Sequence, residues 1–507
     1  MTHVIMTLCP RVKSSNSDKM KSILYTLAAV ILASCSGERP PQLEPTSALP
    51  DIFPDYVDVT IPSRIAPMNF NIADKDAQCV YVKVSGEKGG GMETSGKWAD
   101  FDEREWHELT AMNVGSDLTF DVYVKDSEGN WTRHAPFAMH VSDVPLDDYG
   151  VVYRKIAPGY QTFSKTGIYQ RELSSFEESP VIEETAVQGQ CLNCHYSNRG
   201  SADQFSIHIR GNNGGTLLKN GENISYLNTK APETNGNATY GYWHPEGRYI
   251  AYSVNRIVQN FHLDKGHNIE PWDVFSDLLV LDTETNRLIT SPLVQTPHCE
   301  TTPAFSPDGK KIYFCLADSV TMPGGYERLK YNICSINFDD MGGAFGERID
   351  TVINAKALGM SASLPRPSYD GRFLMYNLTE YGTSPIHHAD ADLWILDLES
   401  GESRRLDEVN SEHSDAYHNW SPGGGWFLFN SKRIDGMYGN LYLSCIGNDG
   451  KATKPFLLPQ RNPLKYYEEA LHSFNAPDFI SEKIKLDMPQ VRSMVSSGMT
   501  TTVSVKK

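Results

Sequence analysis

Four segments in the second half of the chain repeat one pattern of polar and apolar positions. In each, a short polar turn that contains glycine comes first, and a run of apolar residues rich in β-branched and aromatic side chains follows. The segments are residues 243–253, 305–315, 367–377 and 420–430, and they share Gly247, Gly309, Gly371 and Gly424. Glycine tolerates the positive φ of a tight turn, and short apolar runs of this composition favour strands. Each copy therefore predicts a turn that leads into a buried β-strand.

A second strand-like segment follows each of these copies, at residues 277–282, 332–337, 392–397 and 440–444. A unit of turn, strand, turn and strand that recurs at this period is typical of a β-propeller blade. Residues 214–235 and 473–478 resemble further copies, and pairing of the first and last strands in one blade would close the ring. We therefore expect an all-β chain with a propeller of six or seven blades over residues 214–482.

The segment Phe305-Ser-Pro-Asp-Gly-Lys310 strongly resembles the WD-repeat-like propeller motif of the TolB family. The resemblance extends over about residues 236–450. It implies a TolB-like β-propeller fold, and it implies no particular activity.

The residues on either side of the propeller differ from it in pattern. Residues 51–147 alternate short strands and turns, which predicts a β-sandwich of immunoglobulin or fibronectin type. Residues 148–213 show no helical periodicity and are expected to form a connecting segment. Residues 483–507 are polar and are expected to form a disordered tail.

The N-terminal residues look like an export signal. Met20 is followed by Lys21 and an apolar run over residues 23–32, which predicts a signal peptide and a true start at Met20. The run ends in Leu32-Ala33-Ser34-Cys35, which resembles the lipobox of bacterial lipoproteins, where the cysteine becomes the lipidated first residue. We expect residues 1–34 to be a leader and residues 35–50 a tether, with an ordinary cleaved signal as the alternative.

These signals predict a lipid-anchored protein of the cell envelope of a Gram-negative-type bacterium, either periplasmic or on the outer membrane or cell surface. The formal net charge of −17 argues against nucleic acid as a partner. The expected partners are a redox or envelope protein and, through the lipid anchor, a membrane.

One motif carries specific chemistry. Residues Cys191-Leu192-Asn193-Cys194-His195 form C-x-x-C-H, the attachment site of c-type haem. Two thiols at this spacing can each bond to a vinyl group of one porphyrin, and the histidine that follows becomes the proximal ligand of the iron. The sequence therefore predicts one covalent haem c, anchored by Cys191 and Cys194 and ligated by His195.

The other ligands of that site are less defined by the sequence. His208 is the nearest histidine downstream and the candidate distal iron ligand, and Arg210 could pair with a haem propionate. A zinc site built from Cys191, Cys194, His195 and His208, or a disulfide between the two cysteines, remains an alternative. A haem with an open distal side would instead favour peroxide chemistry.

The remaining motifs exclude more than they assign. The chain lacks the G-x-S-x-G elbow of hydrolases, a P-loop and a dinucleotide-binding motif, so we do not expect a hydrolase. Polar residues at 298–300, 361–363 and 415–418 precede the repeated strands and could bind a ligand at one mouth of the channel. The function predicted first is electron transfer with the propeller as docking platform. The alternative is a non-haem propeller that binds a protein, peptide or glycan.

Overall fold

The computed structural model describes residues 38–156, 166–187, 190–264, 267–447 and 449–506. The predicted leader and Cys35 lie outside the described residues. In the ranges that are described, no helix is both long and apolar enough to cross a membrane.

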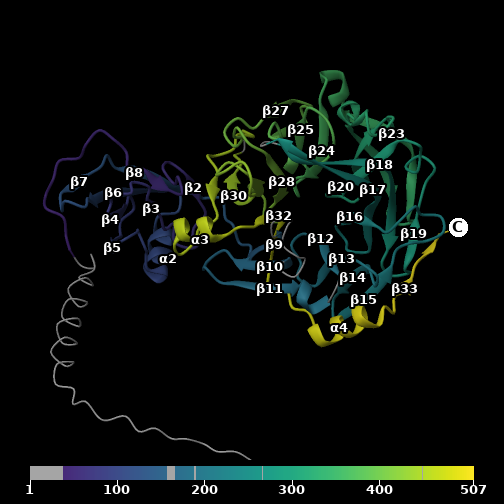
Figure 1. Cartoon of the computed structure of the whole chain (residues 1–507), viewed down its shortest axis with the longest axis horizontal. Coiled ribbons are helices and arrows are strands. Elements are labelled where there is room, and N and C mark those ends of the chain that lie inside the picture. The colour runs from purple at the N-terminus through teal and green to yellow at the C-terminus, as the bar shows by residue number, and fades with distance from the viewer. Residues whose placement is uncertain (1–37, 157–165, 188–189, 265–266, 448, 507) are drawn as a thin grey trace, which may run out of the picture.

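Six four-stranded antiparallel units surround a common axis in the described part of the chain, and they are the blades of a β-propeller (Figure 1). From the innermost strand outwards, blade 1 consists of β32 (Ser473–Ile480), β9 (Gly150–Ile156), β10 (Gly167–Glu172) and β11 (Glu178–Glu183); blade 2 of β12 (Cys191–Ser197), β13 (Gln204–Arg210), β14 (Gly215–Asn220) and β15 (Asn223–Asn228); blade 3 of β16 (Thr239–Trp243), β17 (Tyr249–Asp264), β18 (His267–Asp282) and β19 (Arg287–Ile289); blade 4 of β20 (Cys299–Phe305), β21 (Lys311–Ala317), β22 (Asn332–Asp339) and β23 (Ala344–Ile353); blade 5 of β24 (Ser361–Pro367), β25 (Phe373–Thr379), β26 (Asp392–Asp397) and β27 (Ser403–Arg405); and blade 6 of β28 (Asp415–Trp420), β29 (Trp426–Ser431), β30 (Asn440–Cys445) and β31 (Phe456–Leu457).

Blade 1 joins the two ends of the propeller. Its innermost strand, β32, comes from the C-terminal part of the chain and pairs antiparallel with β9, with Ser473 opposite Ile156 and Ile480 opposite Gly150. In Figure 1 the yellow strand β32 lies beside the blue-teal strand β9. The ring is therefore closed by hydrogen bonds between distant parts of the sequence, as the resemblance of residues 473–478 to a repeat predicts.

The repeated turns have the predicted geometry. The shared glycines Gly247, Gly309, Gly371 and Gly424 have φ values of 79°, 72°, 77° and 81°. The strands that follow these turns are almost completely buried, including Cys315 in β21. Cys334 and Cys445 are also buried core residues, as their strand-like surroundings predict.

The N-terminal module is built on one six-stranded sheet and lies at one side of the propeller (Figure 1). Its elements are β1 (Ile52–Phe53), β2 (Thr60–Ile61), β3 (Asn71–Ile72), β4 (Cys79–Gly86), β5 (Gly91–Gly96), α2 (Glu103–Met112), β6 (Ser116–Lys125), β7 (Trp131–Arg133) and β8 (Phe137–Val141). The strands β1 and β3 pair separately, and Trp106 of α2 stacks on Phe101 at 5.6 Å between ring centroids. The immunoglobulin or fibronectin type stays a prediction.

This module is packed firmly against blade 6. The Tyr56 hydroxyl donates to the carbonyl of Leu457 at 2.9 Å, and the Trp426 indole donates to the carbonyl of Val144 at 3.0 Å. Helix α3 (Pro463–Glu469) follows blade 6, and Asn69 donates to the carbonyl of Arg461 just before it at 2.9 Å. Because these groups are buried in a shared apolar cluster, the module and the propeller share one core.

The structure corrects three predicted boundaries. The segment 148–213 is not a connector, because its strands β9 to β13 belong to blades 1 and 2. Residues 483–506 are ordered: α4 (Met488–Ser497) buries Val491 and Val495, and the strands β33 (Thr501–Thr502) and β34 (Ser504–Val505) pair with β15 and β19. The described end of the tether also contacts the N-terminal sheet, where Thr46 donates to the carbonyl of Arg133 at 2.8 Å.

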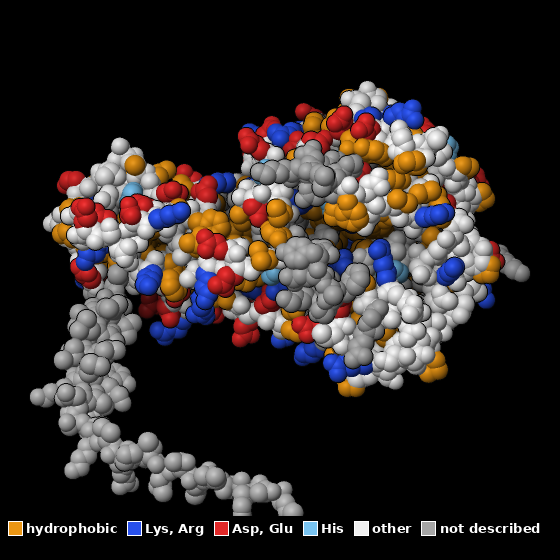
Figure 2. Space-filling model, viewed as in Figure 1, with side chains coloured by type: hydrophobic (Ala, Val, Ile, Leu, Met, Phe, Trp, Pro, Cys, Tyr) orange, Lys and Arg blue, Asp and Glu red, His pale blue; other side chains and the backbone are white. Residues whose placement is uncertain are grey.

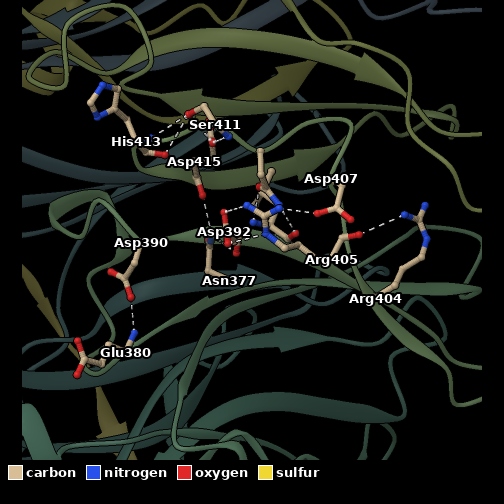
Figure 3. A network of polar contacts seen from close by, with 12 residues as sticks. Asn377, Glu380, Asp390, Asp392, Arg404, Arg405, Asp407, Ser411, His413 and Asp415 are labelled. Atoms are coloured by element: carbon tan, nitrogen blue, oxygen red, sulfur yellow. Dashed lines mark hydrogen bonds and ion pairs between the residues drawn. The ribbon is translucent and has the colours of Figure 1, made fainter.

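Polar contacts join neighbouring blades near the predicted polar cluster at 415–418 (Figure 3). The fully buried Asp415 binds Arg433 at 2.8 Å, and its second carboxylate oxygen accepts from the hydroxyl of Ser411 at 2.8 Å. The Asn377 amide of blade 5 donates to the backbone carbonyl of Asp415 in blade 6 at 2.7 Å. Asp415 therefore ties blades together and does not face a ligand.

The two lobes have different surfaces on the face that Figure 2 shows. Acidic and basic side chains alternate over the N-terminal module, whereas hydrophobic side chains gather near the middle of the propeller. Short 3₁₀ helices connect strands in the described ranges: η2 (Glu184–Val187), η3 (Tyr326–Arg328), η4 (Ala355–Leu358) and η5 (Pro385–His387).

The repeated turns yield a stability prediction. In Gly309→Ala the new methyl group would clash with the His244 imidazole at a backbone φ of 72°, so we expect the free energy of unfolding to fall by about 2–4 kcal/mol. Gly401→Ala is the matched control, because Gly401 has a φ of 74° and open space around it. We expect it to cost only about 1 kcal/mol. Urea denaturation measures both, and equal losses would contradict the argument.

Candidate functional site

The innermost strands enclose a cavity of about 870 Å³ at the centre of the propeller, referred to below as the central cavity. Every blade contributes to its wall, and the long hairpin of β17 and β18 adds Ile257, Gln259, Ile269 and Pro271. A cavity of this size is in the range that holds a cofactor or a drug-sized ligand.

Each innermost strand carries one extra residue where it lines this cavity. The bulges lie at Leu192/His195, Thr239/Tyr242, Thr301/Ala304, Ser363/Arg366, Ala416/Asn419 and Asn475/Asp478. In five of them the first residue inside the bulge has a positive φ, and these residues are Tyr240, Thr302, Leu364, Tyr417 and Ala476. A bulge bends the strand and re-aims its side chains, so the six bulges form a ring of reoriented residues around the cavity.

The C-x-x-C-H motif occupies the bulge of blade 2. Cys191 is opposite Arg210 in the register of β12 and β13, and Cys194 lies inside the bulge with Asn193. Both cysteines line the central cavity, both are partly exposed, and both are free thiols. The two sulfurs that would anchor a haem are thus at the cavity wall and not in the packed interior of the blade.

Charged groups surround Cys191. The Arg154 guanidinium lies 3.5 Å from its sulfur and also donates to the Asn193 side chain at 3.1 Å. Burial raises the pKa of the Cys191 thiol, and the positive charges of Arg154 and Arg210 oppose that rise. Burial also raises the pKa of the neighbouring Glu184 carboxyl, to about 7. Cys191 is therefore a protonated thiol at neutral pH, with an acid–base group beside it.

His195 is placed differently from the two cysteines. Its ring is 2% exposed and lies 6.0 Å from the Phe205 ring, between blades 1 and 2 at the edge of the central cavity. Burial, and then the charge of Arg154, lower its pKa to about 3, while the backbone of Val152 opposes this slightly. Among the described residues, neither ring nitrogen finds a hydrogen-bond partner of ordinary geometry. The imidazole is neutral and unpartnered, which is the form that binds a metal.

His208 does not join His195, and the predicted distal ligation is corrected here. His195 is opposite Ile207 in the register of β12 and β13, so His208 points to the other face of the sheet. Ser206, two residues away on that same face, contacts Tyr252 of blade 3. The two imidazoles thus lie on opposite sides of blade 2 and cannot ligate one iron in this arrangement.

The same geometry removes the four-ligand zinc site. In the part of the chain that the structure describes, no group of three or more His, Cys, Asp and Glu side chains is arranged to hold a metal ion. With His208 on the opposite face, Cys191, Cys194 and His195 lose the fourth ligand that a structural zinc site requires.

Sequence reasoning missed the polar residues at the ends of the other bulges. The buried Asp478 accepts from the Ser197 hydroxyl at 2.6 Å and from the Phe479 amide at 2.9 Å. Arg366 donates to the Asn419 side chain at 3.2 Å and lies over the Tyr242 ring at 5.3 Å. Burial raises the pKa of the Asp478 carboxyl to about 7.

A sequence signal for the bulges exists. Tyr240, Thr302, Leu364 and Tyr417 each lie seven residues before the shared glycine of their repeat. Asn193 stands at the same distance before Gly200, whose φ is 75°. This spacing assigns the C-x-x-C-H motif to the repeat pattern, which the apolar runs alone do not reveal.

The sheets and the central cavity define the class of this protein as a six-bladed β-propeller with a ligand-sized central site. No family model matches the chain, and no curated protein matches it. Among solved structures, it is similar to TolB from Acinetobacter baumannii at 11% identity and a TM-score of 0.43, covering 75% of this chain and 86% of that one.

Two further solved structures have propeller-like similarity. An oligogalacturonate lyase from Vibrio parahaemolyticus has 12% identity and a TM-score of 0.34, covering 59% of this chain and 92% of that one. A periplasmic gluconolactonase from Pseudomonas aeruginosa has 14% identity and a TM-score of 0.33, covering 66% and 99%. At these scores the assignment of the propeller rests on the chain's own strand pairing, and none of these activities transfers to it.

The raised pKa of Asp478 gives a pH-dependent prediction. The folded state holds a proton that the unfolded state releases near pH 4, so this group's contribution to stability is lost as the pH rises from about 4 to 7. We expect Asp478→Asn to stabilise the protein by roughly 2–4 kcal/mol at pH 8 and by little at pH 4. Urea denaturation at both pH values tests this, with the exposed Asp350→Asn as control. A gain that does not depend on pH would argue against it.

Proposed function

We propose that this protein carries one haem c in the central cavity of the propeller, bound covalently through Cys191 and Cys194, and that it transfers electrons to a redox or envelope protein that docks on the propeller. The observation that supports this most directly is the position of the two motif thiols at the wall of a cavity of about 870 Å³. A cytochrome domain of its own is then unnecessary, because the blades supply the enclosure.

The residues around the cavity fit a porphyrin. Aromatic side chains such as Tyr240, Tyr242 and Tyr417 line it, and Arg154 and Arg210 stand beside the motif where carboxylate groups of a porphyrin could be bound. Each cysteine would form a thioether: its sulfur bonds to one vinyl carbon, and the thiol proton moves to the other carbon. Because electrons and atoms balance in this addition, no oxidant is needed.

His195 would supply the proximal nitrogen ligand. Its ring is already neutral and free of hydrogen-bond partners among the described residues, so no bond has to be broken before it binds a metal. When bound, the haem iron would accept and release single electrons. The sixth position of the iron has no assigned ligand, because His208 points away.

The site of action follows from the N-terminal signals as part of this proposal. Lipidation at Cys35 would anchor the protein to a membrane of the cell envelope, on the side where c-type haem is attached. Periplasmic and cell-surface positions both suit such an anchor.

A second candidate is a non-haem propeller that binds a protein, peptide or glycan. The free thiols of Cys191 and Cys194 and the strongly basic lining of the central cavity favour it. In that case the two cysteines would serve only as a local clip.

Haem staining of a denaturing gel tests the first candidate. The full-length protein, made in cells with cytochrome c maturation machinery, is expected to keep its stain after denaturation and to show a Soret band when folded. Cys191→Ala/Cys194→Ala is expected to lose the stain completely. His208→Ala is expected to keep it, because His208 faces the other side of the blade.

The matched control is Cys79→Ala, which removes a buried cysteine of the N-terminal module without touching the motif. It is expected to stain like the wild type. A stained double variant would show that haem is held elsewhere. An unstained wild-type protein, in cells that mature a control cytochrome, would leave the second candidate as the function.

A further inference from the structure

Four arginine side chains line the central cavity, and none of them is paired with a carboxylate. They are Arg154, Arg199, Arg210 and Arg366. The ion pairs within 4.0 Å between described residues use other arginines, namely Arg39, Arg133, Arg248, Arg348, Arg372, Arg404, Arg405 and Arg433. The cavity therefore concentrates positive charge that the protein itself does not neutralise.

Neutral groups hold two of these guanidinium groups in place. Arg366 donates to Asn419 and lies over the Tyr242 ring, as described above. Arg199 donates to the carbonyl of Pro307 at 2.7 Å and lies over the Tyr369 ring at 5.4 Å. Amides, carbonyls and aromatic faces fix the orientation of a guanidinium but leave its charge available to a ligand.

The other two arginines stand beside the C-x-x-C-H motif. Arg154 donates to Asn193, and its Nε is buried without a hydrogen-bond partner among the described residues. Arg210 is exposed and is opposite Cys191 in the strand register. A buried donor without a partner is costly, and a ligand with acceptor oxygens would relieve that cost.

Carboxyl groups near these arginines do not cancel their charge. Asp478 is the one carboxyl group among the described residues that line the cavity, and Glu184 lies near Arg154. Burial raises the pKa of both groups to about 7, so each is substantially protonated at neutral pH. In a chain of net charge −17, this cavity is a local reversal of sign, and its low-dielectric walls strengthen the positive potential.

We propose that the central cavity binds a ligand that carries carboxylate groups, which the guanidinium groups of Arg154, Arg199, Arg210 and Arg366 recognise, while the aromatic side chains of the wall contact its flat apolar body. The planar fork of arginine matches a carboxylate with two parallel hydrogen bonds. The proposal goes beyond haem attachment, because the site is complete without the thioether bonds. The carboxylates can come from the propionates of a haem or from a free small molecule.

Binding of a defined probe to protein made without maturation machinery tests the proposal. Naphthalene-2,6-dicarboxylate is an aromatic dicarboxylate, and its dimethyl ester has the same ring system without the charge. We expect calorimetry to show saturable one-to-one binding of the dicarboxylate that weakens with added salt, and no binding of the ester. Equal binding of the two compounds, or no saturable binding of the dicarboxylate up to about millimolar concentration, would overturn the proposal.

Substitution of one arginine localises the site. Arg210→Gln is expected to weaken binding of the dicarboxylate about tenfold, and Arg210→Lys to lose less because the charge remains. Arg348→Gln is the matched control, since Arg348 is an exposed arginine on blade 4. Thermal unfolding shows whether each variant is folded. A folded Arg210→Gln variant that binds like Arg348→Gln would contradict the assignment.

The haem-loaded protein distinguishes the two sources of carboxylate. If propionates occupy the arginines, the loaded protein loses the binding of the probe. If a separate ligand uses them, the loaded protein retains it. Because haem staining is independent of probe binding, failure of the haem proposal and failure of this one give different results.

Discussion

The pairing of β32 with β9 is the constraint on which the rest of the structure depends. It joins residues 150–156 to residues 473–480, so that more than three hundred residues lie in one closed ring. Without it, blades 1 and 6 would expose unpaired edges and the apolar faces between them. The entropic cost of closing so long a loop grows only slowly with its length, and the shared core of blade 6 and the N-terminal module offsets it.

Ring closure also creates the site. The innermost strands can surround one cavity only if β28 of blade 6 and β12 of blade 2 both flank β32. Closure brings Asn475 of β32 opposite Arg154, and it brings Asp478 within 2.6 Å of Ser197 in β12. The surroundings of the C-x-x-C-H motif are therefore supplied in part by residues nearly three hundred positions away.

The sequence was sufficient for features that are local and repeated. The turn glycines, the strands that follow them and the closing strand at residues 473–478 could be predicted, because φ and burial leave direct marks on residue choice. Blade 2 escaped because Gly200 is followed by a longer turn before β13 than the turn between Gly247 and β17, which hides the repeat. The tail escaped because only widely spaced valines mark its buried face.

The candidate site was less predictable for a different reason. Linear spacing suggested that His195 and His208 could share one ion, yet a single bulge and the alternation of side chains along a strand decide which face each imidazole occupies. The ungrouped arginines of the cavity come from blades 1, 2 and 5, so no window of sequence contains them together. Only the closed ring shows that their charges converge.

The bulges also indicate which part of the motif the fold itself does not need. The second residue inside the bulge is Gly241 in blade 3 and proline in three other blades, at Pro303, Pro365 and Pro477. These residues shape the backbone and bring no reactive group. At the equivalent position, blade 2 has Cys194. Because a propeller bulge of this kind forms without a thiol, the presence of Cys194 at the cavity wall is explained by chemistry in the cavity more readily than by the requirements of folding.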